Sequence, residues 1–196
     1  MFASNDNHLL QSKAWAHFEE HLGRTVITKS TRDFSYVAIL ESTPVGKYLF
    51  VPYGPDIKSE KGFSAAINDL KTVAASHGAF FLRIEPLFRV SGECLKGIKA
   101  VKVKDIDPAE TWVVDLTGDN ILAKMPRRLR GYYNTREGKG ITITASHDPE
   151  DIAHLVRLQA KIFESKNITP YTEKYLKSEL SEDFATLYLA HYENKD

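Results

Sequence analysis

Apolar residues recur at helical spacing in three long segments of the chain, residues 9–22, 59–78 and 151–166. In the second segment the apolar positions fall three or four apart and form one stripe, Phe63, Ile67, Leu70 and Ala74. Ser59 stands where a helix N-cap is expected, and Gly23 stops the first segment. The pattern therefore predicts three amphipathic helices, and a shorter one is expected over 172–180.

Between the first two helices the periodicity changes to that of strands. The segments at 25–28, 34–40 and 47–54 predict strands, and the turn residues of "STPVGK" at 42–47 connect the last two. Residues 79–86, "AFFLRIEP", begin with a nearly unbroken apolar run. Such a run is typical of a central strand that is buried on both faces.

The pattern is weaker after residue 86. Residues 98–104, "IKAVKVK", alternate and predict a strand with one wet, basic face, and 111–116 and 141–146 predict two more. A short helix is expected from Asp119 or Asn120 to Met125, with a second one starting at Pro126. The last strand falls at 185–192, and nothing after it is left to pair with it.

This order of elements predicts an α/β (α+β) fold, in which helices flank a mixed, mostly antiparallel sheet. The sheet extends to about residue 146, and a new helix–helix–strand sequence follows. We therefore expect two domains, 1–146 and 147–196.

Composition narrows the class of protein. The chain has 196 residues, of which 42% are hydrophobic and 27% charged, and no apolar run is long enough to span a bilayer. Cys94 is the only cysteine, which excludes an intramolecular disulfide or a cysteine-cluster metal site. The first residues lack the pattern of a signal peptide. These features favour the cytoplasm.

One stretch stands out in a chain that is formally neutral, with 26 basic and 26 acidic residues. Residues 124–143 gather six basic side chains against the single acid Glu137: Lys124, Arg127, Arg128, Arg130, Arg136 and Lys139. Arginine suits phosphate recognition, and the two tyrosines of the stretch could stack on a base. The alternatives are a nucleic-acid contact, a grip on a phosphate-bearing small molecule, or a solvated helix face.

Two further motifs could contact a ligand. "VPYGPDI" at 51–57 ends a strand in a sharp turn that presents Tyr53, beside Gly54 and Pro55. "RIEP" at 83–86 places Arg83 and Glu85 on one side of a strand. The turn could instead be purely structural, and the two charges could form a structural ion pair.

Several common sites are missing from the sequence. No Gly-Lys-Ser/Thr phosphate loop, no nucleophile elbow and no glycine-rich coenzyme A loop is present. His17 and His21 in "HFEEH" are four apart, but Phe18 stands where a zincin has its glutamate, so no metal site is expected.

Five segments, in this order, resemble the first half of the FemABX family of tRNA-dependent aminoacyltransferases. They are "LLQSKAWAHF", "VPYGPDI", "FFLRIEP", "TWVVDLTGD" and "MPRRLRGYYNTREGKGITI". The resemblance implies two GNAT-like domains in tandem, the second of them incomplete in this chain. It also implies cell-wall (peptidoglycan) synthesis, in which an amino acid moves from aminoacyl-tRNA to the stem peptide of a muramyl precursor, UDP-linked or lipid-linked.

On this basis no cofactor is expected, because aminoacyl-tRNA would be the acyl donor. We expect Tyr53, Gly54, Pro55, Arg83 and Glu85 to contact the precursor, at the cytoplasmic face of the membrane if the precursor is lipid-linked. The basic set Lys124, Arg127, Arg128, Arg130 and Arg136 would bind phosphate or tRNA. Catalytic residues are not assigned.

The alternative is a non-catalytic GNAT-like binding module. It would need a partner chain, or a second copy of itself, which would pair through strand 185–192. A general RNA-binding protein is a third hypothesis, which the zero net charge disfavours.

Overall fold

A computed structural model of the chain describes residues 8–104, 106, 120–135, 140–166 and 169–192. The chain divides into two compact units, residues 1–110 and 111–196. The expected domain boundary at 146–147 falls inside the second unit. The structure combines helices with a mostly antiparallel sheet that they flank, as predicted.

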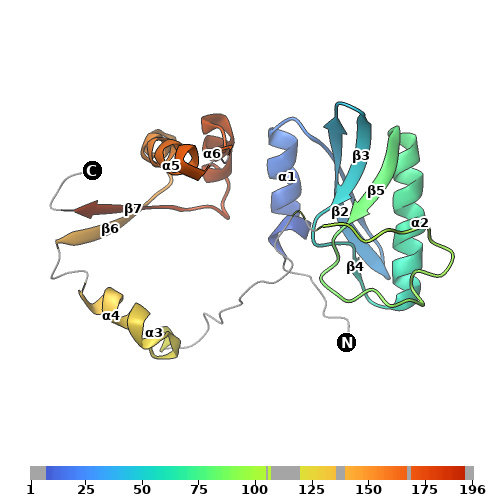
Figure 1. Cartoon of the computed structure of the whole chain (residues 1–196), viewed down its shortest axis with the longest axis horizontal. Coiled ribbons are helices and arrows are strands. Elements are labelled where there is room, and N and C mark those ends of the chain that lie inside the picture. Colours follow the sequence, from blue (N-terminus) through green and yellow to red (C-terminus); the bar gives the residue numbers. More distant parts are fainter. Residues whose placement is uncertain (1–7, 105, 107–119, 136–139, 167–168, 193–196) are drawn as a thin grey trace. The chain divides into compact units, whose positions relative to one another are not determined.

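The first unit is built around a sheet with the strand order β1–β2–β3–β5 (Figure 1). β1 (Thr25–Ser30), β2 (Phe34–Thr43) and β3 (Gly46–Val51) form an antiparallel meander. β5 (Ala79–Ile84) then joins β3 in parallel, and the short β4 (Asp56–Ile57) pairs with the start of β2.

Helices cover both faces of this sheet (Figure 1). A 3-10 turn, η1 (Leu9–Gln11), precedes α1 (Lys13–His21), because the Ser12 side chain accepts the backbone N–H of Trp15 and starts the helix there. α2 (Glu60–Ser76) starts at the predicted N-cap, where Ser59 accepts the N–H of Gly62. The main core lies between α2 and the sheet and includes Phe63, Leu70 and Leu49, all nearly inaccessible to solvent.

Two strand predictions in this unit are wrong. Residues 79–86 were expected to form a central strand, yet β5 has β3 as its only neighbour among the described residues. Phe80 and Phe81 are accordingly 60% and 44% exposed. Residues 98–104 form no strand, and Val101 and Val103 are exposed. Alternation of apolar and polar residues shows which side chains could face a core. A segment forms a strand only if it also pairs with the edge of another strand.

The second unit begins with two short helices, α3 (Ile121–Lys124) and α4 (Arg127–Thr135). β6 (Ile141–Ser146), a 3-10 turn η3 (Pro149–Asp151), α5 (Ile152–Lys166), α6 (Glu173–Leu180) and β7 (Leu187–Tyr192) follow. A small core gathers Ile152, Leu176 and Leu180, with Leu187 packed against it.

The expectation that strand 185–192 has nothing to pair with is also wrong. β7 pairs antiparallel with β6 in a six-residue register, Ile141 opposite Tyr192 and Ser146 opposite Leu187. The partner strand, β6, precedes β7 in the chain by about 40 residues, whereas the prediction considered only the residues that follow β7. The strand expected at 111–116 lies outside the described residues. Within the described residues, no helix has the length and apolarity needed to cross a membrane.

Candidate functional site

The two parallel strands of the first unit end side by side. Val51 lies opposite Ile84 in the register of β3 and β5, and the N–H of Glu85 donates to the carbonyl of Val51 at 3.2 Å. The carboxyl ends of neighbouring parallel strands are where open α/β sheets place their ligands. The structure therefore brings the predicted turn after β3 next to the predicted charge pair of β5.

The turn after β3 has an unusual backbone. Tyr53 adopts a left-handed conformation with φ of 50°, and the Gly54–Pro55 peptide bond is cis. Its neighbours are buried: Gly54 is inaccessible and Pro55 is among the most deeply buried residues. The half-buried ring of Tyr53 lies 4.3 Å, centroid to centroid, from the ring of His8. Tyr53 is thus the member of the turn that keeps an accessible side chain.

Gln11 holds this turn in place, and no role was predicted for it. Its side-chain N–H groups donate to the carbonyls of Val37 at 3.1 Å and Pro52 at 2.5 Å, while its oxygen accepts the N–H of Val37 at 2.9 Å. A Cβ at Gly54 would lie 2.7 Å from the Gln11 amide. Gln11 belongs to "LLQSKAW", so the sequence marked the segment but not the residue.

Arg83 and Glu85 form an ion pair with each other. The Nε and Nη2 atoms of Arg83 lie 2.9 and 2.7 Å from one oxygen of Glu85. The side chains are 17% and 8% exposed. Arg83 also donates to the carbonyl of Lys104, and Glu85 accepts the N–H of Ile106 at 2.9 Å. Of the two interpretations left open by the sequence, the structural ion pair is therefore present, and it fastens Lys104 and Ile106 to the end of β5.

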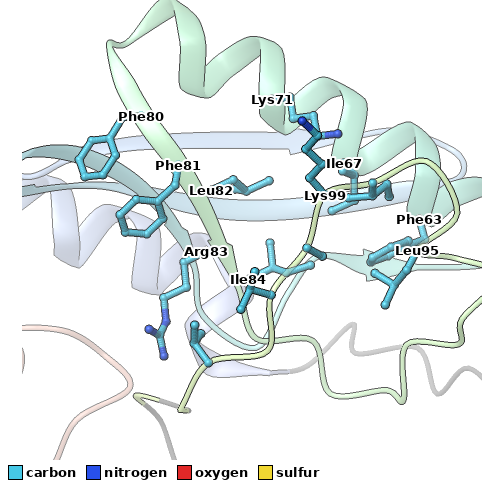
Figure 2. Close-up of a pocket in the computed structure, with 14 residues that line it drawn as sticks. Phe63, Ile67, Lys71, Phe80, Phe81, Leu82, Arg83, Ile84, Leu95 and Lys99 are labelled. Atoms are coloured by element: carbon cyan, nitrogen blue, oxygen red, sulfur yellow. The ribbon is translucent and has the colours of Figure 1, made fainter.

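A cavity of about 590 Å³ lies between α2, β5 and residues 95–103, with Arg83 among its lining residues (Figure 2). Its floor is the core itself, Phe63 and Ile67 of α2 with Leu82 and Ile84 of β5. The segment 95–103 forms the opposite wall. The remaining lining residues are Lys71, Phe80, Phe81, Arg83, Leu95, Ile98, Lys99, Ala100, Val101 and Val103. Nothing in the sequence predicted this cavity, because 98–104 was expected to be a strand.

The predicted phosphate-binding residues belong to the second unit. Arg130 donates to the carbonyl of Ala123 at 2.9 Å, at the end of α3. Arg128 donates to the hydroxyl of Tyr132 at 3.1 Å and lies over its ring. Arg127 and Lys124 are exposed, and Arg136 lies outside the described residues. Arg130 of α4 thus bonds to α3, and Arg128 contacts Tyr132 of its own helix.

The first helix carries a buried acid. Glu19 is 2% exposed, and Nη1 of Arg24 lies 3.1 Å from one of its oxygens without hydrogen-bond geometry. The same Arg24 atom lies 3.3 Å from Glu41. Burial raises the pKa of Glu19; Arg24 opposes the rise and Glu41 adds to it. Glu19 is therefore a buried structural residue of α1 with a raised pKa. His17, on the same helix, is exposed.

Neither a scan against protein-family models nor a search of the curated proteins finds a match to this chain.

Proposed function

We propose that this chain is a FemABX-like protein that binds a muramyl-peptide precursor and serves amino-acid transfer from aminoacyl-tRNA. The five ordered sequence segments motivate the proposal. The observation that supports it in the structure is that two of them, "VPYGPDI" and "FFLRIEP", meet at the carboxyl ends of β3 and β5. This is the position that ligands occupy in related sheet architectures.

In the proposed transfer, an amine of the stem peptide attacks the ester carbonyl of aminoacyl-tRNA. The new C–N bond forms, the ester C–O bond breaks, and the tRNA hydroxyl leaves with the proton that the amine gives up. The amine must be deprotonated, and the charge that develops on the carbonyl oxygen must be stabilised. We assign no residue to these two steps.

The proposed binding site combines a half-buried tyrosine, Tyr53, with a rigid support. Tyr53 presents a hydroxyl and an aromatic face, while Gln11 and the buried Pro55 fix its backbone. Arg83 is oriented by Glu85 and keeps its charge near the same strand ends. A peptide with carboxylate groups would find a hydrogen-bonding tyrosine and an oriented guanidinium there.

The first experiment is calorimetric titration of the full chain with UDP-muramyl pentapeptide, with uncharged tRNA in a parallel titration. Precursor binding that weakens at least tenfold in Tyr53→Ala and in Arg83→Ala supports the assignment. Tyr171→Ala, at an exposed tyrosine outside the proposed binding residues, is the matched control. Arg83 also donates to the backbone of Lys104, so Arg83→Ala could lose structure as well as binding. In that case Tyr53→Ala alone decides whether the site is correct. Wild-type affinity in Tyr53→Ala, or no precursor binding at all, contradicts the proposed site.

A second candidate function is the non-catalytic binding module that pairs with another chain. The supporting observation is β7, which has β6 as its only strand partner among the described residues. Its Tyr188 and Tyr192 are 70% and 54% exposed and alternate along one face. An uncovered strand edge next to exposed aromatics favours pairing with a further strand.

Sedimentation equilibrium over a wide range of chain concentration tests this second function. Self-association that Tyr188→Lys abolishes would support pairing through β7, because a charge on an edge strand opposes edge-to-edge pairing. Tyr171→Lys, at an exposed position outside the strand, is the control. A chain that stays folded and monomeric at high concentration contradicts pairing with a second copy.

A further inference from the structure

We propose that the cavity between α2, β5 and residues 95–103 is a binding site for an amphiphile with one alkyl chain and an anionic head. This site shares Arg83 with the site proposed beside Tyr53 but is formed by other elements, and the inference does not rest on the proposed aminoacyl transfer. Its volume of about 590 Å³ falls within the roughly 300–1,000 Å³ that is usual for small-molecule sites.

The body of the ligand must be apolar. All the lining side chains except the three cations are hydrocarbon, and the deepest of them, Phe63 and Ile67, are 1% and 3% exposed. A polar ligand body would lose its hydrogen bonds to water without replacement, which is unfavourable. An alkyl chain would instead cover apolar surface that the fold leaves open, because Phe80, Phe81, Leu95 and Val101 are all exposed.

The charge of the lining selects the head group. The described residues that line the cavity include three cations and no acid. Arg83 already pairs with Glu85 through contacts of 2.9 and 2.7 Å, so we do not assign it to the head group. Lys71 and Lys99 make no ion pair with any described residue, so their charges remain available for a ligand.

Lys71 and Lys99 also lie where they could contact the anionic head of the ligand. Lys71 comes from α2 and Lys99 from the facing segment, and Figure 2 shows both at the rim away from Arg83. Both side chains are exposed, so their alkyl stems extend the apolar wall while the ammonium groups stay in water. An anionic head would therefore lie at this rim, between two walls that each supply one charge, with its chain toward Phe63.

The test is calorimetric titration of the full chain with dodecanoate below the concentration at which it aggregates. Dodecyltrimethylammonium supplies the same chain with a positive head, and butanoate supplies the same head without the chain. We expect one dodecanoate per chain, at least tenfold weaker binding of the cation, and no measurable binding of butanoate. No saturable dodecanoate binding, or equal affinity for the cationic amphiphile, overturns the proposal.

Two variants locate the site. The double variant Lys71→Glu, Lys99→Glu should weaken dodecanoate at least tenfold. Its matched control is Lys58→Glu, Lys61→Glu, which changes the net charge equally at exposed positions outside the cavity. Ala100→Trp, which adds bulk at the exposed wall, should abolish binding while the circular dichroism of the fold is retained. Dodecanoate affinity that is unchanged in Lys71→Glu, Lys99→Glu, or that falls equally in the control, overturns the assignment.

Discussion

Gln11 is the residue on which the candidate site depends. One side-chain amide joins the backbone of β2 to the turn after β3 through three hydrogen bonds, and Gly54 leaves room for it. The sequence placed Gln11 on the first helix and Gly54 in a turn, 43 positions later. Their contact depends on how η1 packs on the sheet, which no local pattern encodes.

The contact between Gln11 and Gly54 makes a quantitative prediction. Gly54→Ala should displace the Gln11 amide and lower the free energy of unfolding by about 1–3 kcal/mol, because buried backbone groups lose their partners. Gln11→Ala should have an effect of similar size. Urea unfolding of both single variants and of the double variant measures the coupling. We expect Gly54→Ala to change stability little once Gln11 is gone, and fully additive effects would contradict the contact.

Glu19 predicts how stability depends on pH. Because burial raises its pKa in the folded chain, the folded state binds more protons than the unfolded state between the ordinary and the raised pKa. The contribution of Glu19 to stability is therefore greatest at low pH and is lost as the pH rises through that window. The free energy of unfolding of the wild type minus that of Glu19→Gln should be larger at pH 5 than at pH 7.

The measurement for Glu19 is chemical unfolding of both proteins at several pH values. Taking the difference removes the contribution of carboxylates that the two proteins share. A difference that stays constant or grows with pH would contradict the raised pKa.

At the scale of elements, α2 was predicted best. Its cap at Ser59 and its apolar stripe are present as the sequence indicated, because capping and amphipathic periodicity are local properties. The prediction was less accurate on whether a strand is central or at the edge of the sheet. The segment 79–86 is apolar enough to be central, yet it lies at an edge of the described sheet, and its Phe80 faces the open cavity.

Gly62 marks a close approach of α2 to the loop between β1 and β2. A Cβ there would lie 2.5 Å from the backbone carbonyl oxygen of Asp33, which has no freedom to swing away. Gly62→Ala should therefore lower the free energy of unfolding by about 1–3 kcal/mol despite the better helix propensity of alanine. Ser64→Ala, exposed on the same helix, is the control and should be neutral or slightly stabilising. Equal thermal midpoints for the two variants would contradict the close approach.

At the scale of the whole molecule, the two units have separate cores. The first is formed by α2 and the sheet, and the second by Ile152, Leu176 and Leu180, with no residue in common. The two basic segments noted in the sequence lie in different units, because 98–104 belongs to the first unit and Lys124–Arg130 to the second.

Separate cores predict separate responses to core substitutions. Leu70→Ala and Leu180→Ala each remove a buried side chain and should cost about 2–5 kcal/mol in their own unit. Hydrogen exchange read amide by amide checks this, since local stability can differ across a structure. Leu70→Ala should speed exchange in β2 and β3, and Leu180→Ala in α5 and β7. Loss of protection throughout the chain in both variants would show a single cooperative unit instead.

The sequence by itself determined the mixed helix-and-sheet class, the helices α1 and α2 with the cap of α2 at Ser59, and the antiparallel strands joined by short turns. These features depend on residues that are close together in the chain. Only the tertiary structure decided that β7 pairs with β6 and that Gln11 secures the turn at Tyr53. It also decided that Arg83 and Glu85 hold Lys104 and Ile106, and that a cavity lined by Lys71 and Lys99 opens between α2 and β5. Each of these joins groups between about 20 and 50 residues apart, or two faces that separate elements supply. Such contacts form because buried polar groups must find hydrogen-bond partners somewhere in the fold. The periodicity of the sequence does not specify which distant residue supplies the partner.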